Sequence, residues 1–327
     1  MNHVERFRAV MSFQPVDRWP RWEWAMWWDK TIARWHTEGL PRDLNHLQVF
    51  EIAQYFHLDP YQQFWFSPID PSLAFSVTGR VADMDDYRRI RPHLFPSHAP
   101  VIADMAAWAQ QQRRGDAVVW CTIEGFFWFP RTLLGFSRLM LAFYRQPELL
   151  HAINNDLLEY NLDLLEQVFR VCVPTFVTIA EDMSYNHGPM ISQQMFTSFF
   201  APYYRRLVPR LQERGIPLFV DTDGDVTLLV PWLQDLGVTG VLPLERQAGV
   251  DALRLRAQFP KLCMIGHFDK MTMSRGEPAM RAEFERLMPL IRTGGFIPSV
   301  DHQTPPGVSL EQYRSYLRLL EEYTRGH

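Results

Sequence analysis

The chain has 327 residues and a mass of 38.5 kDa, and 47% of its residues are hydrophobic, which suffices for the core of one large domain. No stretch approaches the roughly 20 uninterrupted apolar residues of a membrane helix, and a net charge of −4 gives no general reason to bind nucleic acid. The N-terminus lacks the apolar core of a signal peptide, and the three widely spaced cysteines fit neither a disulfide framework nor a thiolate metal site, so we expect a cytoplasmic protein.

The first hundred residues are rich in aromatic side chains and show little clean periodicity. The run ERFRAVMSF predicts a helix near the N-terminus, and RWEWAM (residues 21–26) is the candidate for the first strand of a barrel. Residues 44–97 mix aromatics with prolines, which indicates an extension and a lid rather than a separate domain. We therefore interpret residues 1–100 as a helical, aromatic-rich extension with the first barrel elements.

Three aromatic runs are candidates for the wall of a binding pocket: WPRWEWAMWWD, FWFSP and EGFFWFPR. Large rings close together can enclose a flat, extended ligand. The alternative is that the rings pack the extension onto the rest of the fold. On the first reading, substrate would contact Trp22, Trp24, Trp27, Phe126, Trp128 and Arg131.

The remainder of the chain alternates between short apolar runs and amphipathic helical patterns. VVWCTIEG predicts a strand, residues 149–173 predict a long helix, and from residue 176 onward strand and helix patterns alternate regularly. Such alternation is the signature of repeated βα units around a parallel sheet. We predict a (β/α)8 TIM barrel in a single domain spanning residues 1–327, with the main barrel in residues 101–327.

Acidic residues and a histidine stand at the ends of the predicted strands. In a parallel barrel the carboxyl ends of the strands open onto one face, so these side chains are expected to converge there. Gathered carboxylates are costly unless a cation neutralises them, which predicts a divalent metal. Asp221 and Asp223 lie two residues apart and point the same way on a strand, and with His302 they form the predicted metal site.

The loop EDMSYNHGPMIS carries acid, base and hydrogen-bonding groups directly after a predicted strand. The candidate catalytic residues are Glu181, Asp182, Tyr185, His187 and Glu245, of which Glu181 or Glu245 would complete the metal site. His267, in MIGHFDK, is a candidate for substrate binding, with a hydrogen-bonded pair to Asp269 as the alternative. Neither a GxSxG elbow nor a GxGxxG fingerprint occurs, which disfavours a nucleophilic serine and a dinucleotide.

Four segments resemble the uroporphyrinogen decarboxylase superfamily: ERFRAVMSFQPVDRWP, VDTDGD, MIGHFDK and GGFIPSVDHQTPPGVSLEQY. The resemblance is clearest over residues 176–316. It implies a (β/α)8 barrel and places the chain beside the decarboxylase and the zinc-dependent, corrinoid-linked methyltransferases. The decarboxylase grips its tetrapyrrole with an arginine-rich stretch of the form RQAGR, whereas this chain has RWEWAMWWD.

The methyltransferase branch carries His-x-Cys where this chain has Asp221-Thr-Asp223, and a further cysteine where it has His302. The resemblance therefore implies a divalent site with oxygen and nitrogen ligands, zinc first among the candidates. It also implies methyl transfer from a small donor, with aromatic donors among the candidates, to a corrinoid protein or a thiol. One alternative is a carboxy-lyase that binds its substrate through Arg21, Arg131 or Arg246. A second is a non-catalytic tetrapyrrole- or corrinoid-binding protein. A homodimer is left open.

Overall fold

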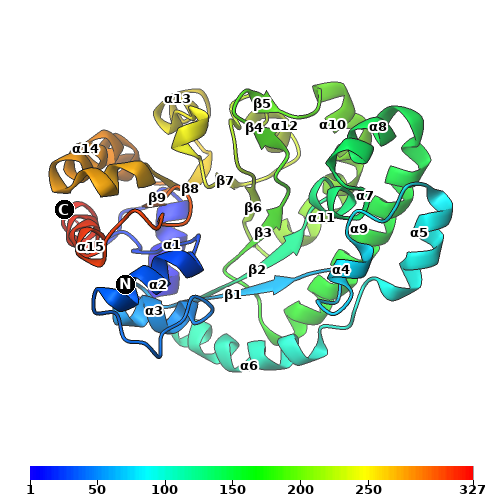
Figure 1. Cartoon of the computed structure of the whole chain (residues 1–327). Helices are drawn as coiled ribbons and strands as arrows, with labels where there is room; N and C mark the ends of the chain where they lie inside the picture. Colours follow the sequence, from blue (N-terminus) through cyan, green and yellow to red (C-terminus); the bar gives the residue numbers. More distant parts are fainter. Residues whose placement is uncertain (327) are drawn as a thin grey trace.

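Seven parallel strands form a single curled sheet in the computed structural model, which describes residues 1–326 (Figure 1). The spatial order of the strands follows the chain, so each strand is joined to its neighbour by a crossover containing helices. The strands are β1 (Tyr61–Phe66), β2 (Val118–Glu124), β3 (Phe176–Ala180), β6 (Leu218–Asp221), β7 (Gly240–Leu242), β8 (Cys263–Phe268) and β9 (Phe296–Val300). The predicted α/β class with a TIM-like parallel sheet is confirmed, with seven strands in the curled sheet rather than eight.

Helices cover the outer side of this sheet (Figure 1). The predicted long helix is present as α9 (Pro147–Val171). The other α-helices are α1 (His3–Met11), α2 (Asp29–Thr37), α3 (Val49–Tyr55), α4 (Ala74–Val77), α5 (Met84–Ile90), α6 (Ala99–Arg114), α7 (Trp128–Leu134), α8 (Phe136–Arg145), α10 (Gln193–Phe199), α11 (Ala201–Gln212), α12 (Val230–Gln234), α13 (Ala252–Gln258), α14 (Glu277–Thr293) and α15 (Leu310–Tyr323).

Short elements complete the chain: a hairpin of β4 (Ser184–Tyr185) and β5 (Gly188–Pro189), and the 3₁₀ helices η1 (Arg91–His93), η2 (Arg246–Ala248) and η3 (Lys270–Arg275). Among residues 1–326, no helix combines the length and apolarity that a membrane crossing needs.

The first strand of the sheet lies outside the segment predicted for it. Residues 61–66 form β1, although the whole stretch 44–97 was interpreted as extension and lid. RWEWAM forms no strand, because the backbone turns there and Met26 takes the left-handed conformation with φ of 65°. The predicted strand at RWEWAM is therefore wrong, and so is the interpretation of residues 61–66 as extension, although the first strand does lie within residues 1–100.

Residues 21–27 instead lie between the two edge strands, β1 and β9, and contact both. On one side Tyr61 Oη of β1 donates to Glu23 O at 2.5 Å. On the other side Trp24 Nε1 donates to Val300 O at 2.9 Å. Individual hydrogen bonds, and not the regular backbone pairing of a strand, therefore join this segment to the two edges of the sheet.

Stacked aromatic rings fill the inside of the sheet at the amino-terminal ends of its strands. The rings of Trp120 and Phe176 lie 5.0 Å apart, those of Trp22 and Trp120 5.8 Å apart, and Phe7 of α1 stacks on Phe176 at 4.9 Å. These rings close the sheet at the amino-terminal ends of its strands, which leaves the carboxyl ends as the open face.

Glu23 is buried in the segment between the edge strands, and its side chain is only 1% exposed. Burial raises the pKa of Glu23 to about 8, well above its ordinary value of 4.5. A carboxyl group whose pKa is raised on folding contributes stability below the unfolded pKa and loses it as the pH rises through the folded pKa. The folded protein should therefore lose stability between about pH 4.5 and about pH 8.

We expect Glu23→Gln to remove this pH dependence, because the amide stays neutral. The free energy of unfolding of the natural protein should fall by about 2 kcal/mol between about pH 6 and about pH 7.5 relative to the variant. Urea unfolding at both pH values measures the difference. Glu51→Gln, at an exposed position, is the matched control and should follow the natural protein. Parallel curves for all three proteins would show that Glu23 is ionised in the folded state.

Candidate functional site

A cavity of about 160 Å³ lies at the carboxyl ends of the strands. Its walls come from separate elements: β1, β3, β6, the start of α7, the loop after β9 and the segment between the edge strands. The lining residues are Trp24, Trp65, Trp128, Ala180, Asp182, Asp221, Asp223 and His302. Three indoles and three carboxylates therefore converge from positions that are far apart in the sequence.

Asp221 is the last residue of β6 and lies in register with Ala180 of β3. Its backbone carbonyl accepts hydrogen bonds from Glu181 N and Asp182 N, whereas its carboxyl group makes no hydrogen bond to any residue among 1–326. Burial, with the neighbouring carboxylates of Asp182 and Asp223, raises the pKa of Asp221 well above its ordinary value. Asp221 is thus an acid that the fold itself leaves without a partner.

Asp223 faces the same cavity after the strand has ended. His302 Nε2 lies 3.7 Å from Asp223 Oδ2. Burial and the charge of Asp182 raise the pKa of Asp223 to about 6, and His302 opposes that rise. Gly224 follows with φ of 86°, and a Cβ there would lie 2.5 Å from Tyr185 N, so only glycine lets this turn pack against the β4–β5 hairpin.

Arg131 of α7 holds Asp182 in place. Arg131 Nη2 lies 3.2 Å from Asp182 Oδ2, and its Nη1 donates to Asp182 O at 3.3 Å. The same guanidinium lies 4.3 Å from the ring centre of Trp128, within cation–π distance. One of the three cavity carboxylates is therefore already paired with a fixed cation.

Glu181 does not line the cavity, although it directly precedes Asp182. Its carboxylate is completely buried and accepts hydrogen bonds from Phe126 N at 3.0 Å, Phe127 N at 2.7 Å and Tyr204 Oη at 2.7 Å. Burial raises its pKa to about 7, and these donors oppose the rise. Glu181 therefore fastens the loop before α7 to the end of β3.

Glu245 and His267 also lie outside the cavity wall. Lys270 Nζ lies 3.6 Å from Glu245 Oε1 and 3.3 Å from Asp301 Oδ1, so Glu245 belongs to a small ion-pair group beside the cavity. His267 is completely buried, and its Nδ1 lies 2.8 Å from Leu244 O. Burial and the nearby Arg286 lower the pKa of His267 to about 3, which suits a structural, neutral imidazole.

The remaining predicted residues divide between the surface and the core. Tyr185 and His187 belong to the β4–β5 hairpin region, where their rings meet edge to face at 5.6 Å outside the cavity wall. Trp22, Trp27 and Phe126 are buried at 2% exposure or less and pack against other rings, as the alternative reading of the aromatic runs proposed. Of the predicted wall, Trp24 and Trp128 line the cavity and Arg131 lies beside it.

The three predicted metal ligands share the cavity without forming a ligand set. Within residues 1–326, no three His, Cys, Asp or Glu side chains are arranged to hold a metal ion. Asp223 and His302 face each other, whereas the charged neighbours of Asp221 are the carboxylates of Asp182 and Asp223. The arrangement suits proton transfer and charge pairing better than it suits a metal.

Two residues at this end of the sheet were not among the predicted site residues. Trp65 belongs to FWFSP, one of the three candidate wall runs, and it lines the cavity from β1, the strand that was not predicted. Glu124 ends β2 in register with Ala180, so its side chain leaves the sheet on the same side as that of Asp221. Glu124 is 6% exposed, and burial raises its pKa to about 7. Glu124 ends the apolar run VVWCTIEG in the same way as acids end the later strands, so the sequence pattern could have identified it.

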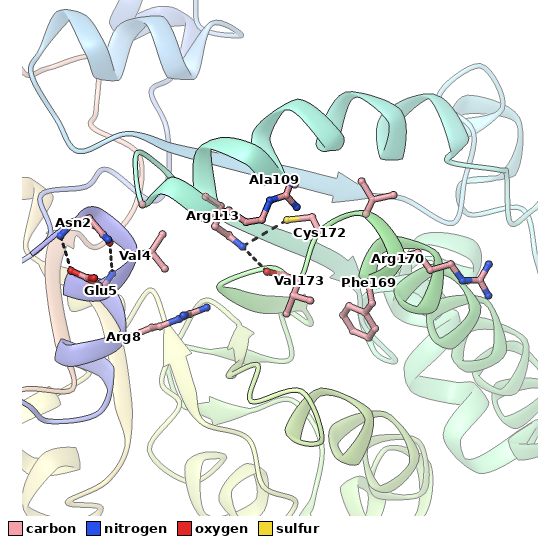
Figure 2. Close-up of a pocket in the computed structure, with 13 residues that line it drawn as sticks. Asn2, Val4, Glu5, Arg8, Ala109, Arg113, Phe169, Arg170, Cys172 and Val173 are labelled. Carbon is pink, nitrogen blue, oxygen red and sulfur yellow. Dashed lines mark hydrogen bonds between the residues drawn. The ribbon is translucent and has the colours of Figure 1, made fainter.

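A larger cavity of about 560 Å³ lies at the other end of the sheet, between α1, α6 and the end of α9 (Figure 2). Arg8, Arg113, Arg170 and Cys172 are among its lining residues. In Figure 2 Arg170 points away from Arg8, so the arginines do not converge on one point. The smaller cavity is the better candidate, because active sites of parallel barrels form at the carboxyl ends of the strands.

Comparison with solved structures supports the fold. A methyltransferase from Methanosarcina mazei aligns over 99% of both chains with 13% identity and a TM-score of 0.68. A Listeria monocytogenes protein described as a vitamin-B12 independent methionine synthase aligns over 95% of this chain and 97% of its own, with 11% identity and a TM-score of 0.47, which carries no further weight. At such identities the likeness concerns the fold alone.

Comparison of sequences gives the family. No curated protein matches the chain. The model of the family described as "Uroporphyrinogen decarboxylase (URO-D)" matches residues 63–323, which is most of the chain and includes every strand of the sheet from Gln63 of β1 onward. The chain therefore belongs to the uroporphyrinogen decarboxylase (URO-D) family.

Proposed function

We propose that the protein is a methyltransferase of the URO-D family, which takes a methyl group from a small donor held in the strand-end cavity. The observation that carries the proposal is the carboxyl group of Asp221, which has no hydrogen-bond partner among residues 1–326 and faces a cavity walled by three indoles. A volume of about 160 Å³ lies below the roughly 300–1,000 Å³ of sites for larger ligands. It suits a small donor better than a tetrapyrrole.

The reaction needs positive charge on the atom that gives up the methyl group. A nucleophile, the thiol or reduced corrinoid of an acceptor, attacks the methyl carbon and forms a new bond to it. The old bond from the methyl carbon breaks, and its electron pair stays on the leaving atom, which departs neutral. Asp221 either gives that atom a proton beforehand or pairs with the positive charge it already carries. Asp223 and His302 lie beside it to exchange the proton with solvent.

The arginines argue against a carboxylated substrate. Arg21 donates to Thr324 Oγ1 at 3.1 Å, and Arg246 Nη1 donates to Val250 O at 2.5 Å, so both are engaged outside the cavity. Arg131 alone lies beside the cavity, and Asp182 holds it. A substrate carboxylate would meet three acidic side chains here, which disfavours the decarboxylase alternative.

A divalent metal is the other means of activating the donor. Asp221, Asp223 and His302 would hold it, and it would polarise the leaving atom as a Lewis acid. Because these side chains do not form a ligand set, we assign the activation to the carboxyl group.

Methyl transfer to a thiol and to cob(I)alamin, assayed with methylamines, methyl sulfides and methoxyarenes as donors, tests the proposal. We expect a methylated acceptor from at least one donor class, with activity that survives dialysis against a chelator. If chelation abolished the activity and zinc restored it, a metal and not the carboxyl group of Asp221 would activate the donor. Release of carbon dioxide from aryl acids or tetrapyrroles, with no methylated acceptor from any donor, would overturn the proposal.

A further inference from the structure

We infer that the strand-end cavity recognises a cationic methyl donor, a methylated ammonium or sulfonium group. The inference rests on the proposed function and names the substrate class of the same cavity. Three carboxylates line the cavity. Among residues 1–326, Arg131 pairs with Asp182 and His302 faces Asp223, whereas Asp221 has no ion-pair partner. Asp221 is left as the carboxylate for the ligand.

Glu124 adds a second buried carboxyl group, one oxygen of which has no hydrogen-bond partner among residues 1–326. Its side chain is more than nine-tenths buried, and its Oε2 makes no hydrogen bond. Its register with Ala180, and through Ala180 with Asp221, places both acids in one layer on the inner side of the sheet. Two acids in this layer therefore lack a cation that residues 1–326 could supply, which is the charge pattern expected of a site for a positive ligand.

The indoles of the wall fit the same ligand. Quaternary ammonium groups lack a hydrogen to donate and are bound by the faces of aromatic rings, tryptophan best of all. Trp24 is fixed by its hydrogen bond to Val300 O at 2.9 Å, and Trp128 already packs against a guanidinium at 4.3 Å. Trp65 comes from β1, so the three rings belong to three separate elements. Three indoles from different parts of the chain therefore contribute to one cavity wall.

A cationic donor also fits the chemistry. A methylated ammonium or sulfonium already carries the positive charge that the leaving atom requires. When the nucleophile takes the methyl group, the electron pair of the broken bond returns to nitrogen or sulfur, and a neutral amine or sulfide departs. The loss of charge weakens the attraction of the acidic cavity for the product and so favours its release.

Tetramethylammonium and its neutral counterpart of similar shape, 2,2-dimethylpropan-1-ol, test the inference by calorimetry and tryptophan fluorescence. We expect the natural protein to bind the cation about tenfold or more tightly than the alcohol. Asp221→Asn should abolish this preference, and Trp128→Leu should weaken binding of the cation. Asp235→Asn, at an exposed position, should change nothing. Thermal melts establish that each variant is folded.

Equal affinity for the cation and the alcohol in the natural protein, or a preference that survives in Asp221→Asn, would overturn the inference. The two proposals fail separately. Transfer from a neutral methoxyarene without a cation preference would remove this inference and keep the methyltransferase. A cation preference without methyl transfer from any donor would remove the proposed activity and keep the cation site.

Discussion

Asp221→Asn should lower kcat/KM for methyl transfer by about 10²–10⁴-fold, the range associated with removal of a positioned acid or base. The amide neither gives a proton to the leaving atom nor balances its charge. The variant should fold normally, with a free energy of unfolding within about 1 kcal/mol of the natural protein, because the carboxyl group makes no hydrogen bond that would be lost among residues 1–326. Steady-state kinetics and urea unfolding measure the two quantities.

Asp235→Asn is the matched control for this experiment, since it makes the same chemical change at an exposed position on the outside of the fold. Its kinetics should equal those of the natural protein. Near-normal turnover in Asp221→Asn, with the control also normal, would show that the strand-end carboxyl group takes no part in the reaction.

Gly125→Ala should destabilise the protein by about 3 kcal/mol or more. A Cβ at this position would lie 2.2 Å from the carboxyl carbon of Glu181 and 2.6 Å from Ala180 O. The carboxylate would have to move, and its bonds to the amides of Phe126 and Phe127 would break inside the core. A buried charged acceptor that loses its donors costs far more than an exposed one.

Thermal and urea unfolding measure this loss. Gly307→Ala is the control, because a Cβ there meets no atom within 4 Å and the backbone is not left-handed. It should leave the unfolding free energy within about 0.5 kcal/mol of the natural value. Equal stability of the two alanine variants would mean that Glu181 can leave its amide donors at little cost.

The parts of the fold that could be predicted from sequence are those with local patterns. α9 has a clear helical period, and β3 and β9 are buried along their whole length, so their apolar runs are easily recognised. β1 has the sequence YQQFWF, with glutamines among its rings, and such a strand looks irregular. The turn at Met26 lies beside Trp24, whose indole bonds to Val300 O of β9, and no local pattern reveals such a distant contact.

The site divides in the same way. Acids after strands could be assigned to one face, and Asp182, Asp221, Asp223 and His302 do line one cavity. Which way each carboxylate turns could not be foreseen. Glu181 and Asp182 are adjacent, yet one bonds to the amides before α7 and the other faces the cavity. Which of the two side chains is buried depends on the position of the N-terminus of α7 relative to β3.

The bonds that join residues 21–27 to β9 connect residues that are far apart in the chain. Trp24 bonds to Ser299 and Val300, 275 and 276 positions later. While the ribosome is still making the protein, the indole of Trp24 must wait for nearly the whole chain before its partner on β9 emerges. During that time this exposed indole can associate with the hydrophobic surfaces of other nascent chains. Efficient production in a cell should therefore depend on a chaperone that shields this early segment until synthesis is nearly complete.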